Sequence, residues 1–477
     1  MSNAKTLFIN GEWKAGPATF DVLNPADGSV IETVSDGSPV EATAAVDAAA
    51  AALPAWAATP PRERSEMLRR TWEYMVRDID EITQLIALEN GKSLTDAKGE
   101  VTYAAEFFRW FAEEAVRTGG DYGVSPAGGT RTIVTHKPVG VAALITPWNF
   151  PAAMATRKIA PALAAGCTVM LKPASETPLT AFKITRLLTE AGVPDGVVNV
   201  VSSSDAGSIA TTWLEDPRVR KISFTGSTRI GQVLLKQAAE RVVNSSMELG
   251  GNAPLVVTDD ADLDKAVAGT MIAKFRGGGQ ACTAANRLYV HADVADAFAA
   301  KLGAEVEKLK VGPGTDESTQ IGPLISAKAV DGVTKLVESA VAGGATISHQ
   351  ASIPESDGFY YPPTVLTGVS HDSDIVREEI FGPVAPIITW TTDDEVIRMV
   401  NDTEFGLAAY VFAGELQRGM RLGEAIDAGM VGINRGLVSD PSAPFGGMKQ
   451  SGLGREGARA GLEEFLETQY LSVDWPS

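Results

Sequence analysis

Val139-Gly140-Val141-Ala142-Ala143-Leu144-Ile145-Thr146 is an apolar run of strand length that opens a repeating pattern. A helix is predicted over Ala152–Ala165, and a second apolar strand over Thr168–Lys172. The alternation continues with strands at Val197–Val201 and Lys221–Phe224, and with helices at Thr180–Ala191, Asp205–Leu214 and Ile230–Arg241. Apolar strands that alternate with amphipathic helices are typical of a parallel sheet covered on both faces. The fold class is therefore predicted to be α/β.

The rest of the chain divides into further units. Residues 41–118 are rich in alanine and predicted to be helical, whereas residues 119–138 have the glycines and alternating pattern of a β-hairpin. A second α/β pattern begins at Pro254 and runs to about Gly429, and Leu462–Trp475 has a strand-like pattern. Because 477 residues are too many for one core, we expect two or three domains.

An acidic composition limits the partners that this chain can have. The net charge of −19, from 60 acidic and 41 basic residues, argues against nucleic acid or an anionic membrane. The N-terminus, Met1–Lys5, shows no secretory signal, and two cysteines cannot build a disulfide framework, so we expect a cytoplasmic protein. The four histidines lack metal-ligand spacing, so no metal site is predicted.

Cys282 is the candidate nucleophile. It stands in Gly279-Gln280-Ala281-Cys282-Thr283, after a helix-like run from Asp262 to Phe275. The glycine turn leaves room for a carbonyl carbon to approach, and backbone N–H dipoles there could support a thiolate. The alternative is a buried structural cysteine, which is how we interpret the other cysteine, Cys167.

Two further residues complete a set suited to acyl-transfer chemistry. Glu248 follows a β-type run and precedes Gly250-Gly251, so its carboxylate has room to move and to activate water. Asn149 lies just past the first strand, where an amide can donate to an oxyanion. Taken singly, Glu248 could be a surface glutamate and Asn149 a turn asparagine.

A cofactor site is indicated after the later strands of the first pattern. The usual G-x-G-x-x-G fingerprint is absent, but Gly226 and Gly231 straddle a strand-to-helix turn at Ser227. The N–H groups of a helix that begins there could bind a pyrophosphate. Lys172, at the end of another strand, could bind ribose hydroxyls or a 2′-phosphate.

These segments resemble the aldehyde dehydrogenase superfamily, and the resemblance covers essentially the whole chain. The motifs that carry it are Thr146–Pro151, Lys172-Pro173-Ala174, Phe224–Ser227, Glu248–Pro254, Gly279–Cys282, Glu378–Pro383 and Pro444–Gly447. The resemblance implies that Cys282 is the nucleophile, Glu248 the general base and Asn149 the oxyanion donor. It further implies a nicotinamide dinucleotide cofactor, with Glu379 on its ribose, bound by Thr146, Pro147, Trp148, Lys172, Gly226, Ser227, Glu379 and Phe381.

The same resemblance gives each unit a role. It implies a Rossmann-type dinucleotide-binding domain from residues 1–118 and 139–250, to which residues 431–457 return. It implies a catalytic domain over residues 251–430, and an oligomerisation arm from residues 119–138 and 458–477. A homodimer or homotetramer is therefore expected, and the resemblance does not decide between them.

The cofactor prediction is NADP, with NAD also possible. Many NAD-preferring relatives have a glutamate three residues after the lysine, where this chain has Ser175. A carboxylate there repels the 2′-phosphate of NADP, whereas a hydroxyl can donate to it. The neighbouring Glu176 could turn inward and weaken this preference.

For the substrate, the chain is most similar to the succinate-semialdehyde dehydrogenases. In that subgroup two arginines and a serine hold the distal carboxylate, and the matching residues here are Arg157, Arg276 and Ser439. The prediction is an aldehyde that carries a carboxylate, such as succinate semialdehyde. The alternatives are a broad aliphatic or aromatic aldehyde dehydrogenase, whose arginines pair with acids, and a non-catalytic binding protein.

Two departures from the subgroup stand near the predicted site. Gly277-Gly278 replaces the usual Asn-Thr or Asn-Ala, which predicts a more mobile loop before Cys282. Arg435 occupies a position that is usually small or uncharged, and it could widen a cationic rim at the substrate entrance. Its role, and the physiological aldehyde, stay open.

Overall fold

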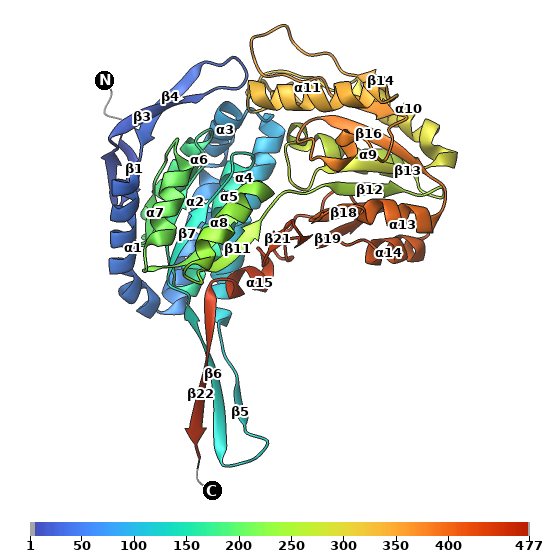
Figure 1. The fold of residues 1–477 in the computed structure, drawn as a ribbon. Coiled ribbons are helices and arrows are strands. Elements are labelled where there is room, and N and C mark those ends of the chain that lie inside the picture. The colour runs from blue at the N-terminus through green and yellow to red at the C-terminus, as the bar shows by residue number, and fades with distance from the viewer. Residues whose placement is uncertain (1–4, 476–477) are drawn as a thin grey trace.

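The computed structural model describes residues 5–475 (Figure 1). Met1–Ala4, on which the prediction about a secretory signal depends, and Pro476-Ser477, the end of the predicted arm, lie outside the described residues. Within the described part of the chain, no helix is both long and apolar enough to cross a membrane.

An eight-stranded sheet forms the first unit. Its strands, in spatial order, are β2 (Glu12–Ala15), β1 (Lys5–Ile9), β9 (Val198–Val200), β8 (Thr168–Lys172), β7 (Val141–Ile145), β10 (Val219–Thr225), β11 (Asn244–Glu248) and β21 (Gly452–Leu453). The five strands from β9 to β11 are parallel, as predicted. The edge strands are antiparallel: β1 and β2 form a hairpin across the tight turn at Asn10-Gly11, β1 pairs antiparallel with β9, and β21 pairs antiparallel with β11.

Helices cover both faces of this sheet and form two hydrophobic clusters. One cluster joins the strands to α2 (Pro61–Arg77), α3 (Ile79–Asn90), α4 (Leu94–Glu114), α5 (Pro151–Ala165) and α6 (Pro178–Glu190). The other joins them to α1 (Pro39–Ala58), α7 (Ala206–Glu215) and α8 (Thr228–Ala239). Four of these helices begin with proline, whose fixed φ and missing N–H suit a first helical turn.

A seven-stranded sheet forms the second unit. Its strands, in spatial order, are β14 (Thr346–Gln350), β15 (Thr364–Thr367), β16 (Val384–Trp390), β13 (Ala285–His291), β12 (Ala253–Val257), β18 (Ala408–Phe412) and β19 (Met430–Ile433). Its helices are α9 (Leu263–Thr270), α10 (Ala295–Val306), α11 (Ala327–Ala342), α12 (Asp374–Arg377), α13 (Asp393–Asn401) and α14 (Leu416–Glu424), with a 3-10 turn at Ala292–Val294.

The placement of the C-terminal segment corrects one predicted boundary. Residues 431–457 were expected to return to the first unit, but β19 is hydrogen-bonded to β18 in the second sheet. Strand β20 (Met448–Lys449) pairs with β17 (Phe405–Gly406), also from the second unit. Only β21 joins the first sheet, because its partner β11 offers a free edge there.

A separate three-stranded sheet projects from the body of the molecule (Figure 1). It consists of β5 (Tyr122–Val124), β6 (Thr130–Pro138) and β22 (Leu466–Asp474), and β22 pairs with β6 along its whole length. A 3-10 turn (Ala115–Arg117) precedes the arm, and α15 (Ala458–Glu463) packs against α4 and α5 rather than joining it. A two-stranded sheet of β3 (Ala18–Leu23) and β4 (Val30–Asp36) completes the fold.

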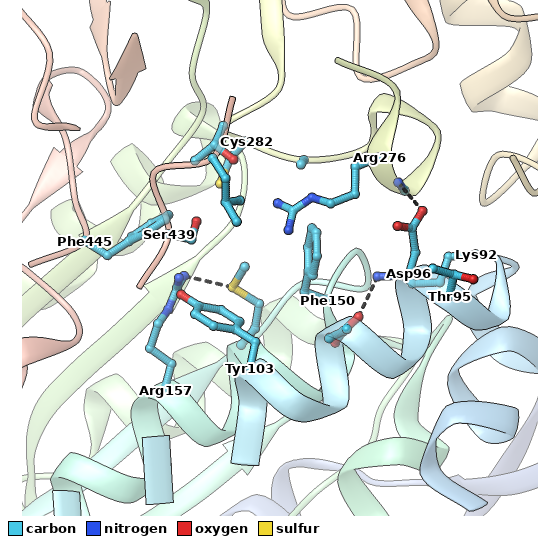
Figure 2. A pocket seen from close by; sticks show the side chains of 17 residues that line it. Lys92, Thr95, Asp96, Tyr103, Phe150, Arg157, Arg276, Cys282, Ser439 and Phe445 are labelled. Carbon is cyan, nitrogen blue, oxygen red and sulfur yellow. Dashed lines mark hydrogen bonds and ion pairs between the residues drawn. The ribbon is translucent and has the colours of Figure 1, made fainter. Parts of the chain in front are cut away.

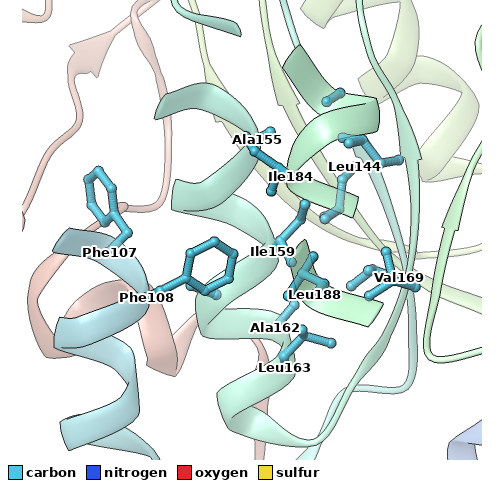
Figure 3. Close-up of a cluster of buried hydrophobic side chains, with 14 of the residues drawn as sticks. Phe107, Phe108, Leu144, Ala155, Ile159, Ala162, Leu163, Val169, Ile184 and Leu188 are labelled. Atoms are coloured by element: carbon cyan, nitrogen blue, oxygen red, sulfur yellow. The ribbon is translucent and has the colours of Figure 1, made fainter. Parts of the chain in front are cut away.

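The buried side chains packed against the first sheet indicate where a substitution should lower the free energy of unfolding most. Ile159 of α5 is fully buried among Leu144, Ile184 and Leu188 (Figure 3). Replacing Ile159 with alanine should lower the free energy of unfolding by about 2–5 kcal/mol, because the surrounding side chains collapse only partly into the cavity. Urea unfolding followed by circular dichroism measures the change.

The control is Val233→Ala on α8, a position that is 45% exposed. That substitution should change the free energy by less than about 0.5 kcal/mol. Equal effects of the two substitutions would contradict the packing described here.

Candidate active site

Two cavities meet at Cys282. The first encloses about 240 Å³ between α4, α5 and the loop that carries Ser439 (Figure 2). The second encloses about 250 Å³ between the carboxyl ends of the first sheet and the segment around Glu379. Cys282 lines both cavities, so this residue lies where the two spaces meet.

Three consecutive glycines shape the turn before Cys282. Gly277, Gly278 and Gly279 have φ values of 59°, 66° and 72°, a region that residues with side chains rarely adopt. A Cβ on Gly279 would lie 2.3 Å from the carbonyl oxygen of Gly382, so only glycine fits there. The helix-like run predicted to reach Phe275 changes character at Thr270, and Met271–Phe275 form a π-helical turn, a feature frequent at functional sites.

The surroundings of Cys282 oppose ionisation of its thiol. Burial raises the pKa of the Cys282 thiol to about 12. The charge of Arg157 opposes this rise, whereas the carboxylates of Glu379, Glu248 and Glu456 add to it. The surroundings therefore disfavour the thiolate that was expected from the sequence at this turn.

Asn149 lies in the short segment between β7 and α5, beside the nucleophile turn. Its Nδ2 donates a hydrogen bond of 3.1 Å to the backbone carbonyl of Gln280, two residues before Cys282. An amide nitrogen carries two hydrogens, so one remains for a ligand oxygen. Asn149 and Cys282 both line the second cavity, which is the arrangement an oxyanion site requires.

Glu248, at the end of β11, is buried and lines neither cavity. Burial and the charge of Glu456 raise the pKa of Glu248 well above its usual value, while Arg157 and Lys158 oppose the rise. Its Oε2 has no hydrogen-bond partner among residues 5–475. Its Oε1 lies close to Gly446. A Cβ added to that glycine would come within 2.9 Å of this oxygen. Glu248 must therefore turn toward Cys282 to reach a water in either cavity.

The two predicted substrate arginines both line the first cavity (Figure 2). They differ in burial and in whether a carboxylate pairs with the guanidinium group. Arg157 is buried, forms an ion pair with Glu456, and lies 4.0 Å above the Phe445 ring. Arg276 is half-buried, lies 5.6 Å from the centre of the Phe150 ring, and forms no ion pair within residues 5–475. Of these two cavity-lining arginines, only Arg157 is paired with a carboxylate among residues 5–475.

Ser439, the third predicted substrate residue, and Arg435, the residue predicted at the rim, differ in position relative to the first cavity. Ser439 lines the first cavity with the two arginines. Arg435 is exposed and does not line it, so it adds no charge to the cavity wall. Its charge instead contributes to lowering the pKa of Asp440, where hydrogen bonds from Ser442 have the larger effect.

Six of the predicted cofactor residues line the second cavity, namely Pro147, Trp148, Gly226, Ser227, Glu379 and Phe381. Ser227 precedes α8, whose first turn has no side-chain cap, so its N–H groups are open to an anion. Trp148 and Phe381 meet edge to face with ring centres 5.6 Å apart. Burial raises the pKa of Glu379 to about 7, and its Oε1 accepts a hydrogen bond from the Gly251 N–H.

Thr146, Lys172 and Ser175 lie beyond the wall of this cavity, at the ends of β7 and β8. The Thr146 N–H donates to the Lys172 carbonyl, and the buried Lys172 ammonium has no hydrogen bond or ion pair within residues 5–475. The Ser175 hydroxyl donates to the Glu176 carboxylate at 3.1 Å. An open helix N-terminus, an unpaired ammonium and a carboxylate together fit the phosphates and ribose of a dinucleotide.

The sequence missed Glu456, which is buried and holds both Arg157 and Lys158. No local pattern marks it, because it stands in a loop 299 residues after Arg157 in the numbering of the chain. It also missed Lys92 and Asp96, which line the first cavity from the start of α4. Neither residue stands in a motif that indicates a site, and an acidic residue in the first turn of a helix, such as Asp96, is common without a functional role.

Comparison with known proteins agrees with this geometry. A sequence profile of the aldehyde dehydrogenase family matches residues 13–471. The chain belongs to the aldehyde dehydrogenase family. The α/β fold and the oxidoreductase class predicted from the sequence are those of this family and are confirmed.

Individual relatives of this aldehyde dehydrogenase are similar over their full length. Glutarate-semialdehyde dehydrogenase of Pseudomonas putida is 50% identical over 468 residues, which cover 98% of this chain and 97% of the relative. The NADP(+) succinate-semialdehyde dehydrogenase GabD of Escherichia coli is 49% identical with the same coverage. The crystal structure of an NADP-dependent enzyme from E. coli matches with a TM-score of 0.97 at 48% identity, covering 99% of this chain and 98% of that one.

The raised pKa of Cys282 predicts a slow, strongly pH-dependent alkylation of the resting dehydrogenase. Because the thiolate is the reactive form, the rate with iodoacetamide should rise about tenfold per pH unit from pH 7 to pH 10 without a plateau. Mass spectrometry of the modified peptide measures the rate. Cys282→Ala protein is the control and should remain unmodified, because Cys167 is fully buried. A plateau near pH 8 would show a lower pKa.

Proposed function

We propose that this aldehyde dehydrogenase oxidises a short semialdehyde that carries a carboxylate, such as succinate semialdehyde, to the diacid with NADP. The observation that carries the proposal is the position of Cys282 between two cavities. One has an unpaired arginine for a carboxylate, and the other has the donors that suit a dinucleotide. The printed names of close relatives, which act on succinate and glutarate semialdehyde, support the same substrate class.

The proposed chemistry begins at the sulfur of Cys282. As the sulfur bonds to the aldehyde carbon, the thiol proton passes to water, the C=O π bond breaks, and the free Nδ2 hydrogen of Asn149 donates to the oxyanion that forms. A bound nicotinamide would supply the hydride acceptor for the carbon attached to Cys282, and loss of that hydride would leave a thioester on the sulfur. Pro147, Trp148, Gly226, Ser227, Glu379 and Phe381 would hold that cofactor in the second cavity, with Thr146, Lys172 and Ser175 beyond it.

Glu248 is proposed to complete the cycle. A carboxylate with a raised pKa is a stronger base toward water than an exposed glutamate. The Gly250-Gly251 pair after Glu248 gives the backbone freedom for the side chain to turn toward Cys282. Water activated by Glu248 would attack the thioester, release the acid and restore the thiol.

We also propose that the units divide these tasks as the resemblance implies. The first sheet would bind the dinucleotide, the second unit would supply the nucleophile, and the β5-β6-β22 arm would join subunits into a homodimer or homotetramer. Exposed Tyr122, Val124, Tyr470 and Leu471 on the arm support an intersubunit contact. The acidic surface and two unpaired cysteines support a cytoplasmic location.

A second candidate function is oxidation of uncharged aldehydes. The ion pair between Arg157 and Glu456 favours it, because that arginine is already neutralised within the protein. The wall of the first cavity, with Tyr103, Phe150, Leu437 and Phe445, would suit an apolar substrate. The unpaired Arg276 favours the semialdehyde acid, and the following experiment distinguishes the two functions.

Replacing Arg276 with alanine should lower kcat/KM for succinate semialdehyde by about 10–100-fold, mainly through KM. A hydrogen bond to a charged group contributes about 1.5–3 kcal/mol, and that contribution is lost. With butanal, an uncharged aldehyde of equal chain length, kcat/KM should change by less than about threefold. Arg435→Ala removes the same charge outside the cavity and should leave both substrates unaffected. An equal loss for both aldehydes would support the uncharged-substrate function.

Replacing Ser175 with glutamate should lower kcat/KM for NADP at least about tenfold and leave NAD nearly unchanged. The added carboxylate would repel the 2′-phosphate, which NAD lacks. Glu176→Gln should act in the opposite direction, because it removes the carboxylate that now accepts the Ser175 hydroxyl. Steady-state kinetics with both cofactors measure these changes, and a tenfold preference of the unmodified enzyme for NAD would contradict the NADP prediction.

A further inference from the structure

A buried lysine lies directly behind the oxyanion donor. Lys92 follows α3 and the left-handed residue Gly91, and only 4% of it is exposed. Its ammonium donates to the backbone carbonyl of Asn149 at 2.7 Å and to Oε2 of Glu100 at 2.5 Å. It also lies 3.9 Å above the Phe150 ring (Figure 2). Two of these three interactions are made with the segment that carries Asn149, and the third is made with Glu100 of α4.

Glu100 holds the other end of that segment. Its Oε1 accepts hydrogen bonds from the N–H groups of Ala152 at 2.9 Å and Ala153 at 3.3 Å. These groups belong to the first turn of α5, which has no side-chain cap of its own. A carboxylate at a helix N-terminus satisfies free N–H groups and interacts favourably with the helix dipole.

A third contact comes from the same region of the chain. Asn90 Nδ2 donates to the backbone carbonyl of Trp148 at 3.0 Å. The carbonyls of residues 148 and 149 and the amides of residues 152 and 153 are thus all bound by side chains from residues 90–100. The backbone around Asn149 is fixed on both sides, which leaves its side chain little freedom beside Cys282.

We propose that Lys92 and Glu100 are positioning residues that hold Asn149 where it can donate to the oxyanion. The inference rests on the proposed dehydrogenase chemistry and adds two residues to it. Stability alone does not account for the pair, because burying two charges is often no more stabilising than apolar packing of the same volume. Positioning does account for it, since a displacement of about 1 Å at a reacting group can slow a reaction about 100-fold.

The test uses Lys92→Met, which keeps side-chain length and removes the charge. Single-turnover formation of reduced nicotinamide, with enzyme in excess, should slow by about 10–100-fold. The loss should be the same for succinate semialdehyde and butanal, because Asn149 serves every aldehyde. The dissociation constant for NADP, followed by protein fluorescence, should change by less than about twofold. A loss confined to the charged aldehyde would assign Lys92 to substrate binding and overturn the proposal.

A double-mutant cycle shows whether Lys92 acts through Asn149. In an Asn149→Ala background, Lys92→Met should slow the reaction by less than about threefold, because the group it positions is already gone. Losses that multiply in the double variant would overturn the proposal, as would an unchanged rate in Lys92→Met alone. A full rate in Asn149→Ala alone would instead contradict the proposed function.

Lys183→Met is the matched control, since Lys183 is a largely buried lysine that pairs with Asp78 at 2.7 Å, away from both cavities. Its single-turnover rate should stay within about twofold of the unmodified enzyme. If Lys92→Met does not fold, Glu100→Gln tests the same pair, because the amide weakens the hold on Lys92 and keeps the oxygen for α5. That variant should be about 3–30-fold slower, and again only when Asn149 is present.

Discussion

A hydrogen bond between Asn149 and Gln280 joins the two α/β units beside Cys282. The Asn149 side chain comes from the end of the first sheet, and the Gln280 carbonyl that accepts its N–H belongs to the turn before the nucleophile. Hydrogen-bond geometry tolerates only a few tenths of an ångström. This contact, together with the hydrogen bond from the Gly277 N–H to Asp96, ties the turn before Cys282 to the first unit. Both of its ends are held in turn, Asn149 by Lys92 and Gln280 by the N–H of Ile325.

A second set of buried amides fixes the cofactor side of the site. Asn286 donates to the Asn252 side chain at 2.7 Å and to the Glu378 carbonyl at 2.8 Å, and it accepts the Ile380 N–H at 3.0 Å. Glu379 stands between these two anchored neighbours. Its carboxylate thus reaches the second cavity from a rigid backbone, even though residues 378–383 form no strand or helix.

Buried charge beneath the thiol sets the electrostatics of the site. Arg157 and Lys158 share the carboxylate of Glu456, and Lys158 also donates to Ser223. Burying these groups is tolerated because each is paired. Arg157 lowers the pKa of Cys282, whereas Glu456 raises the pKa of Glu248. The members of this cluster act in opposite directions on both groups, because Glu456 also raises the pKa of Cys282 and Arg157 and Lys158 lower that of Glu248, so burial has the largest effect on each pKa.

The sequence by itself determined the parallel strands of the first sheet, the nucleophile motif and the residues at the strand ends, because each depends on local periodicity or on a short run of neighbours. It did not determine the antiparallel edges of that sheet or the placement of β19 in the second unit. Only the tertiary structure decided that Arg157 is neutralised by Glu456, that Arg276 has no ion pair among the described residues 5–475, and that Lys92 lies behind Asn149. Those facts depend on contacts between residues tens to hundreds of positions apart, and burial, which governs their charges, is not a property of any segment alone.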